Sequence, residues 1–129
     1  MDRVCRTDRE YGEPSPGVRL ADLAGGTRAS MKFWRIEPGA TLPTHRHSNE
    51  QIGFLISGRL VAVLEDGEVP LEPGDSYVFS SDEFHGAENR SDEPAVGIGV
   101  LSPPRNAPSW GDDRAASEPE QTDPIESDE

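Results

Sequence analysis

The chain consists of short apolar segments separated by turn residues, with no long apolar or helical stretch. Residues 31–37 alternate loosely and include two aromatic side chains, and residues 51–57 are apolar and β-rich. Such runs, bounded by Gly, Pro, Asn or Asp, are typical of β-strands. The pattern predicts strands at 31–37, 51–57, 59–65, a short segment ending at Leu71, 76–80 and 95–101.

The turn residues between these segments predict how the strands connect. Asp66-Gly67 is a β-hairpin signal, and Pro38-Gly39 and Pro73-Gly74 are turn pairs. Pro103-Pro104 cannot continue an inner strand. Six or seven short strands joined in this way predict an all-β, antiparallel sandwich or barrel.

The length of 129 residues allows one core and therefore one domain. We expect an N-terminal arm at 1–28, the barrel at 29–105 and an acidic, disordered tail at 106–129. The arm contains an apolar patch at 18–23, which could form an edge strand that pairs with another subunit. The tail has too few apolar residues to offset the entropy lost on ordering.

The charge is strongly acidic: 25 Asp and Glu stand against 12 Lys and Arg, a net charge of −13. Such a surface repels nucleic acids and anionic membranes, so neither is an expected partner. Acidic excess with Lys32 as the single lysine suits a salt-rich cytoplasm, although an ordinary acidic protein with a disordered tail would look similar. The charged N-terminus and the absence of any long apolar run predict a soluble, cytoplasmic protein.

All three histidines fall in a pattern that suits a metal ion. His45 and His47 are two residues apart, so on a strand they face the same side, about 6.6 Å apart. Gln51 is too far along an ideal strand unless the chain bends near Ser48-Asn49, and His85 must come from a neighbouring strand. Imidazole and amide donors suit Ni, Zn, Fe, Mn, Co or Cu, and we expect one such divalent ion.

Around these residues the chain resembles the cupin superfamily over roughly residues 31–105. The first cupin motif is matched by Gly39, His45, His47, Gln51 and Gly58. The second is matched by Gly74, His85 and Asn89. This resemblance implies a double-stranded β-helix, or jelly-roll barrel, with His45, His47, Gln51 and His85 as metal ligands.

Three residues depart from the cupin pattern. Ser80 and Asp82 replace a Pro and a Gly of the second motif, which affects a turn. Gln51 replaces the more usual Glu. Glu50 is an alternative ligand, but a slip of one residue turns a side chain to the opposite face of a strand, so Gln51 is preferred.

Among cupins, the glutamine-type site and the segment ending at Arg105 look similar to small sugar-acid cupins of pectin breakdown. In those proteins an Asp, a Phe and an Arg line the site; here Gly99 and Leu101 replace the first two, and Arg105 matches the Arg. Arg105 could hold a carboxylate in a bidentate manner or form a surface ion pair. Tyr77 and Glu50 are candidates for moving protons. Other residues expected to line the barrel are Phe33, Gly53, Leu55, Phe79 and Leu101.

Three functions remain open from the sequence. The first is a metal-dependent enzyme that isomerises a small oxygenated acid or sugar acid, or opens its ring. The second is a cupin dioxygenase, and the third is a protein that binds a metal and a small anion without turnover. An uncharged ligand set leaves the ion's full positive charge, which favours an anionic ligand. The resemblance also implies a homodimer.

Overall fold

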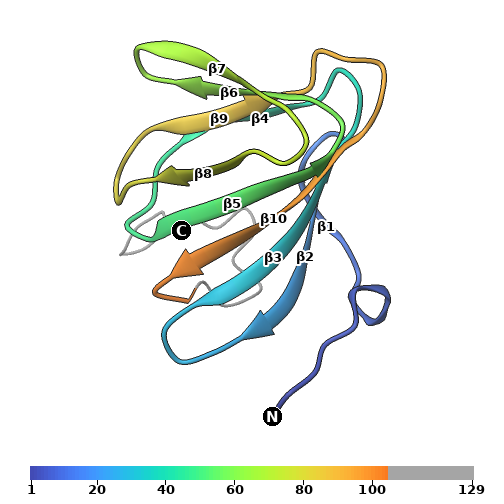
Figure 1. Cartoon of the computed structure of the whole chain (residues 1–129), viewed down its shortest axis with the longest axis vertical. Helices are drawn as coiled ribbons and strands as arrows, with labels where there is room; N and C mark the ends of the chain where they lie inside the picture. The colour runs from blue at the N-terminus through green and yellow to red at the C-terminus, as the bar shows by residue number, and fades with distance from the viewer. Residues whose placement is uncertain (105–129) are drawn as a thin grey trace.

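The computed structural model describes residues 1–104, and within them ten strands form two antiparallel sheets that face each other (Figure 1). The larger sheet has the order β1-β2-β3-β10-β5-β8, and the smaller has the order β4-β9-β6-β7. Six strands make the larger sheet: β1 (Gly12–Ser15), β2 (Val18–Gly25), β3 (Ser30–Ile36), β10 (Ala95–Ser102), β5 (Glu50–Ser57) and β8 (Ser76–Phe79). Four make the smaller: β4 (Thr41–His45), β9 (His85–Glu88), β6 (Leu60–Leu64) and β7 (Gly67–Leu71). The all-β prediction is confirmed.

Strict alternation of buried and less buried residues in β3 and β10 defines the core between the sheets. Leu55 and Ala95 are fully buried there, and Trp34 and Ile36 are buried beside them. Since successive side chains of a strand point to opposite faces, one face of each central strand packs inward and the other faces outward.

The residues predicted as an N-terminal arm form two strands of the larger sheet. β2 pairs with β3 of the same chain, and β1 pairs with β2 at the sheet edge. Val18 is fully buried in the core. A short 3-10 helix, η1 (Arg6–Asp8), precedes these strands. The residues of the expected tail at 106–129 lie outside the described part of the chain.

A buried asparagine ties the two histidine-bearing segments to the core. Asn89, which ends the second motif, donates side-chain hydrogen bonds to the carbonyl oxygens of Ile36 (2.9 Å) and Glu93 (2.7 Å). Its backbone pairs with Gly39 and Ala40 just before β4. The start of β4 and the end of β9 are therefore fixed to each other, which helps to position His45 at the end of β4 and His85 at the start of β9.

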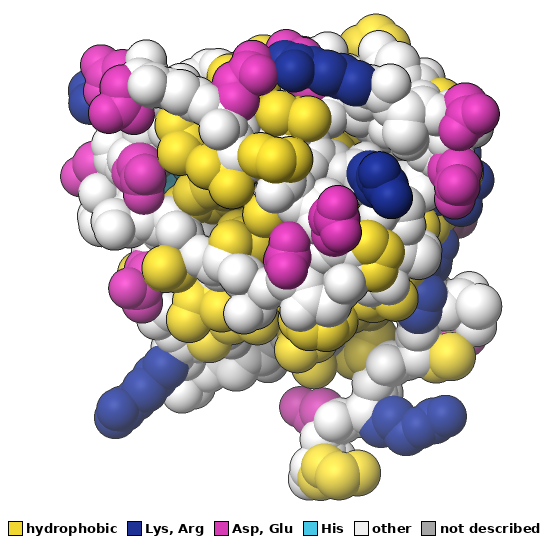
Figure 2. All heavy atoms as spheres, turned by 45° about the horizontal axis from the view of Figure 1, so that its top comes forward, with side chains coloured by type: hydrophobic (Ala, Val, Ile, Leu, Met, Phe, Trp, Pro, Cys, Tyr) yellow, Lys and Arg dark blue, Asp and Glu magenta, His cyan; other side chains and the backbone are white. Residues whose placement is uncertain are grey.

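The molecular surface mixes charged and apolar side chains. On the face drawn in Figure 2, acidic side chains lie beside apolar ones, and Lys and Arg are scattered. Within residues 1–104 there is no helix with the length and apolar character needed to cross a bilayer.

Candidate metal centre

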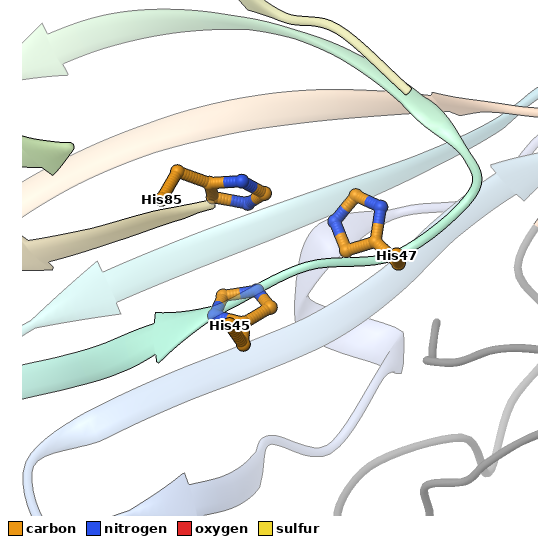
Figure 3. Close-up of side chains that lie close together, drawn as sticks. All are labelled: His45, His47 and His85. Carbon is orange, nitrogen blue, oxygen red and sulfur yellow. The ribbon is translucent and has the colours of Figure 1, made fainter. Parts of the chain in front are cut away.

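The three histidines converge on one point between the sheets. His45 ends β4 and is the register partner of His85, the first residue of β9. His47 lies two residues further along the chain from His45. One ring nitrogen from each residue lies within 4.8 Å of the others, and the three rings surround the same space (Figure 3).

Each imidazole is oriented by a hydrogen bond from its Nδ1 atom to a backbone carbonyl. The acceptors are the oxygens of Pro43 for His45 (2.9 Å), Asn49 for His47 (3.0 Å) and Glu83 for His85 (2.9 Å). Because a carbonyl oxygen can only accept, Nδ1 carries the proton and the Nε2 atom of each neutral ring is an acceptor. Such outer hydrogen bonds are the usual way in which proteins orient metal-binding histidines.

Gln51 offers a candidate fourth donor beside the three imidazoles. Its side-chain oxygen lies 3.2 Å from Nε2 of His47, so two acceptor atoms face each other. Two atoms that bind one ion at about 2.1 Å each are held about 3 Å apart, which accounts for this contact. The donor set therefore fits a divalent transition metal. The chain bends at Ser48-Asn49, as expected, and this bend brings Gln51 within reach.

The loop of the second motif braces the first. The Asp82 amide donates to the His47 carbonyl (2.8 Å), and the Ser81 hydroxyl donates to the Ser48 carbonyl (2.8 Å). Asp82 has a φ of 64°, a left-handed conformation that Gly adopts without strain and that Asp tolerates better than most residues. Asp82 thus adopts the left-handed conformation at the position where the motif has a Gly.

A cavity of about 330 Å³ opens beside these ligands. Its wall includes the four candidate ligands and the predicted lining residues Tyr77, Phe79 and Leu101. The Phe79 ring stacks on His85, with centroids 4.1 Å apart and an angle of 8° between the planes. This stacking restricts rotation of the His85 imidazole.

Tyr77 is held as a neutral phenol. Burial raises the pKa of its hydroxyl to about 12, since the phenolate would lose its hydration. The nearby Trp34 side chain lowers this pKa by a smaller amount. Among residues 1–104, the Trp34 N–H has no hydrogen-bond partner within normal distance and angle limits. At neutral pH Tyr77 can therefore donate a proton or a hydrogen bond but cannot act as a base.

A family model described as "Cupin domain" matches residues 32–101. The chain belongs to the cupin family. The fold comparison agrees: KdgF from a Halomonas species superimposes with a TM-score of 0.75 at 23% identity, over 82% of this chain and 96% of that one. The predicted jelly-roll barrel is thereby confirmed.

Two curated relatives carry different names. This cupin is 36% identical over 67 residues to H2HPP isomerase from Bacillus subtilis, covering 52% of this chain and 28% of the relative. It is 33% identical over 92 residues to gentisate 1,2 dioxygenase 1 from Aquipseudomonas alcaligenes, covering 70% of this chain and 26% of the relative. The chain thus spans about a quarter of the length of each of these proteins.

Other residues expected at the site of this cupin lie elsewhere. Glu50 is exposed and does not line the cavity, so the structure does not bring it to the histidines. Phe33 lies on the other face of β3, where the Arg6 guanidinium packs 5.1 Å from its ring centroid. Leu55 is a core residue, and Gly53 lies beneath the Tyr77 ring. Arg105 lies outside the described residues.

Most of the described cavity wall was not predicted from the sequence, including Lys32 and Trp34 of β3. The two-residue period of a β-strand could have identified both residues. Trp34 and Ile36 are apolar residues two apart in β3, so they share the inward face, and Lys32 belongs to the same series. Phe33, which was expected to line the barrel, lies one residue out of this series and therefore has the opposite orientation.

Proposed function

We propose that this cupin is a metal-dependent enzyme that isomerises a small oxygenated acid, such as a sugar acid, or opens its ring. The observation that carries the proposal is the convergence of three imidazoles, each with Nδ1 held by a backbone carbonyl, beside Gln51 and a largely apolar cavity. Cupin relatives named as an isomerase and as a dioxygenase support a catalytic role.

The charge of the site favours an anionic substrate. The four proposed ligands are uncharged, and no Asp or Glu lines the cavity among residues 1–104. A divalent ion bound there would supply Lewis-acid chemistry toward a carbonyl or hydroxyl oxygen. With no carboxylate in the described wall to offset that positive charge, a small acid is better accommodated than a neutral sugar or a cation.

Tyr77 is the best-placed proton donor in the described cavity wall. Its hydroxyl stays protonated because of the raised pKa, and it lies on the same wall as Gln51, whose strand pairs with β8. A neutral phenol can donate a hydrogen bond to an oxygen atom that gains negative charge during isomerisation. Arg105, outside the described residues, remains a proposed additional contact for the anionic end of the substrate.

The metal site is tested by measuring metal affinity in matched variants. We expect metal-free protein to bind one Co²⁺ or Zn²⁺ per chain. Replacing a ligand (His85→Ala or Gln51→Ala) should lower the affinity at least about 100-fold, the upper range for loss of an outer-shell partner. Calorimetric titration of the folded variants measures this change.

Glu50→Ala is the control, because Glu50 is the neighbour of Gln51 and is exposed outside the cavity. Its metal affinity should equal that of the wild type. A loss of affinity in Glu50→Ala with none in Gln51→Ala would reverse the ligand assignment. Equal binding by the wild type and His85→Ala would remove the metal site from the proposal.

The second candidate is a dioxygenase, which the similarity to gentisate 1,2 dioxygenase 1 favours. Oxygen consumption separates it from the first candidate, since isomerisation and ring opening use no O₂. Metal-loaded protein is incubated with small hydroxy and keto acids while O₂ and product are followed, with His45→Ala as control. Product without O₂ uptake supports the isomerase proposal, and binding without turnover supports a binding protein.

A further inference from the structure

Lys32 is a buried ammonium group in the wall of the metal cavity. It is 5% exposed, and its side chain forms an ion pair with Asp22 on the adjacent strand β2. Its position in β3 places it between the cavity and this carboxylate, which is itself 27% exposed. An ammonium group has three donors, so pairing with Asp22 is compatible with donation to a ligand.

The positive charge of Lys32 distinguishes it from the other residues of the described cavity wall. Of the residues between 1 and 104 that line the cavity, Lys32 is the only Lys or Arg, and most of the others are apolar. Burial of an ion pair seldom adds stability over apolar residues of similar size, because desolvation offsets the attraction. Packing alone therefore gives no reason for a charge at this position.

The sheet register places Lys32 opposite Tyr77 across a gap. One row across the larger sheet reads Asp22, Lys32, Gly99, Gly53 and Tyr77, each residue being the register partner of the next. A Cβ atom added to Gly53 would lie 2.2 Å from the Tyr77 hydroxyl oxygen, so the phenol reaches over this glycine. A Cβ on Gly99 would meet no atom closer than 3.5 Å, so space remains between the phenol and the lysine strand.

The same register gives the distance between Lys32 and the metal ligands. Gln51 lies two strands away from Lys32 and two residues along its strand from Gly53. With ordinary strand spacings, the two Cα atoms are about 12 Å apart. The lysine Nζ is paired with Asp22 on the β2 side of this gap, so a bound molecule has to span it. A carbon chain of a few atoms can do so.

We propose that Lys32 forms a carboxylate-binding subsite, which holds the anionic end of the ligand while a second oxygen atom, a few carbons away, faces the histidines. The inference rests on the proposed function, because the histidine site anchors the other end of the same molecule. It names the substrate class more closely: a monocarboxylate with a carbonyl or hydroxyl group separated from the carboxylate by a short chain.

The test compares a keto acid with its neutral ester. The probes are 4-oxopentanoate and its methyl ester, titrated calorimetrically into cobalt-loaded and metal-free protein. For the wild type we expect the acid to bind more tightly than the ester. Lys32→Met should raise the Kd of the acid about 10- to 100-fold, the range for loss of a hydrogen bond to a charged group, and leave the Kd of the ester unchanged.

A second variant guards against misfolding. Lys32→Met leaves Asp22 without its ion-pair partner, whereas Lys32→Met with Asp22→Asn removes both charges together. Both variants should show the same loss of acid binding, and both should bind Co²⁺ as the wild type does, because neither residue is a proposed ligand. A merely structural role for Lys32 would not distinguish the acid from the ester.

The outcomes separate the two proposals. If the wild type fails to bind Co²⁺ while Lys32→Met still loses preference for the acid in metal-free protein, the proposed function fails and the subsite stands. If Co²⁺ binds but the acid and the ester bind equally, or Lys32→Met keeps the wild-type preference, the subsite is overturned. Failure of the acid to bind either form of the wild type also overturns it.

Discussion

Tyr77 shows how a single side chain depends on the residue opposite it. Its register partner is Gly53, and a Cβ atom at that position would lie 2.1 Å from the phenol carbon Cζ. The absence of a side chain on Gly53 thus allows the ring to lie across the sheet. The price is burial of the hydroxyl, which raises its pKa to about 12. The same contact therefore sets the orientation of the phenol and its protonation state.

Ionisation of Tyr77 is expected to occur late in an alkaline titration. Tyr77 has a folded pKa of about 12, above its ordinary value of 10.0, so its phenolate absorbance should appear only in strongly alkaline solution. Between pH 10 and 12 the unfolded chain releases this proton first. The free energy of unfolding should consequently fall as pH rises through this window, by about 1–3 kcal/mol. Absorbance at alkaline pH and denaturant titrations measure both effects.

Tyr77→Phe is the matched control, since it keeps the ring and removes only the hydroxyl. This variant should lose the late ionisation and show a smaller decline in stability between pH 10 and 12. The interpretation is wrong if Tyr77→Phe leaves the late transition in place.

The spacing of residues was sufficient to predict that the histidines lie together, but not to predict which residues line the cavity. The two motifs identified His45, His47 and His85, and their convergence in the structure follows from the pairing of β4 with β9. The roles of Lys32 and Gly53 depend on register partners in other strands, Gly99 and Tyr77. Local sequence contains no information on register between distant strands, so these relations could not be predicted from it.

At the scale of elements, the segments with the strongest apolar patterns correspond to strands of the structure. β3, β5, β6 and β10 lie within one or two residues of the predicted segments. β4 and β9 are absent from the segments predicted from apolar pattern, although the histidines were expected on strands, because Thr41–His45 contains a proline and His85–Glu88 is short and polar. These two strands are defined by pairing with neighbours, a tertiary effect that outweighs weak local propensity.

The N-terminal strands are expected to be essential for folding, although they lie outside the matched family segment at 32–101. A chain that starts at residue 29 would lack β1 and β2 and therefore expose the paired edge of β3. It would also lose Val18 from the core and part of the cavity wall. We expect this shortened chain to lose cooperative thermal unfolding, measured by circular dichroism.

A smaller truncation provides the comparison. A chain that starts at residue 10 loses η1 and the Arg6 contacts with the Tyr11 and Phe33 rings, but keeps both strands. Such cation–π contacts at exposed positions contribute about 1 kcal/mol, so its unfolding should remain cooperative with a slightly lower midpoint. If the chain starting at residue 29 unfolds like the wild type, the two strands are dispensable and the core begins at β3.

At the scale of the whole molecule, the outer face of the larger sheet is apolar in a chain that is otherwise highly charged. One register row on this face reads Met31, Val100, Ile52 and Val78, and the last two side chains are 51% and 55% exposed. Phe54, in the next row, is 41% exposed. Continuous apolar surface of this kind on a soluble domain usually marks an interaction site.

We expect this face to pair with the same face of a second copy. A two-fold contact brings identical patches together, so apolar rows meet apolar rows. The net charge of −13 opposes association of two copies, and salt screens this repulsion. The dimer fraction should therefore rise with NaCl concentration, as measured by light scattering coupled to size-exclusion chromatography.

A pair of matched variants decides whether this face forms the dimer. Ile52→Lys places a charge in the apolar row of β5 and should give a monomer at salt concentrations where the wild type is a dimer. Val69→Lys has the same chemistry at a comparable exposure, 45%, but on β7 of the opposite sheet, so it should stay dimeric. Equal behaviour of the two variants would show that the contact lies elsewhere, and a wild type that stays monomeric in high salt would show that the apolar face does not mediate self-association.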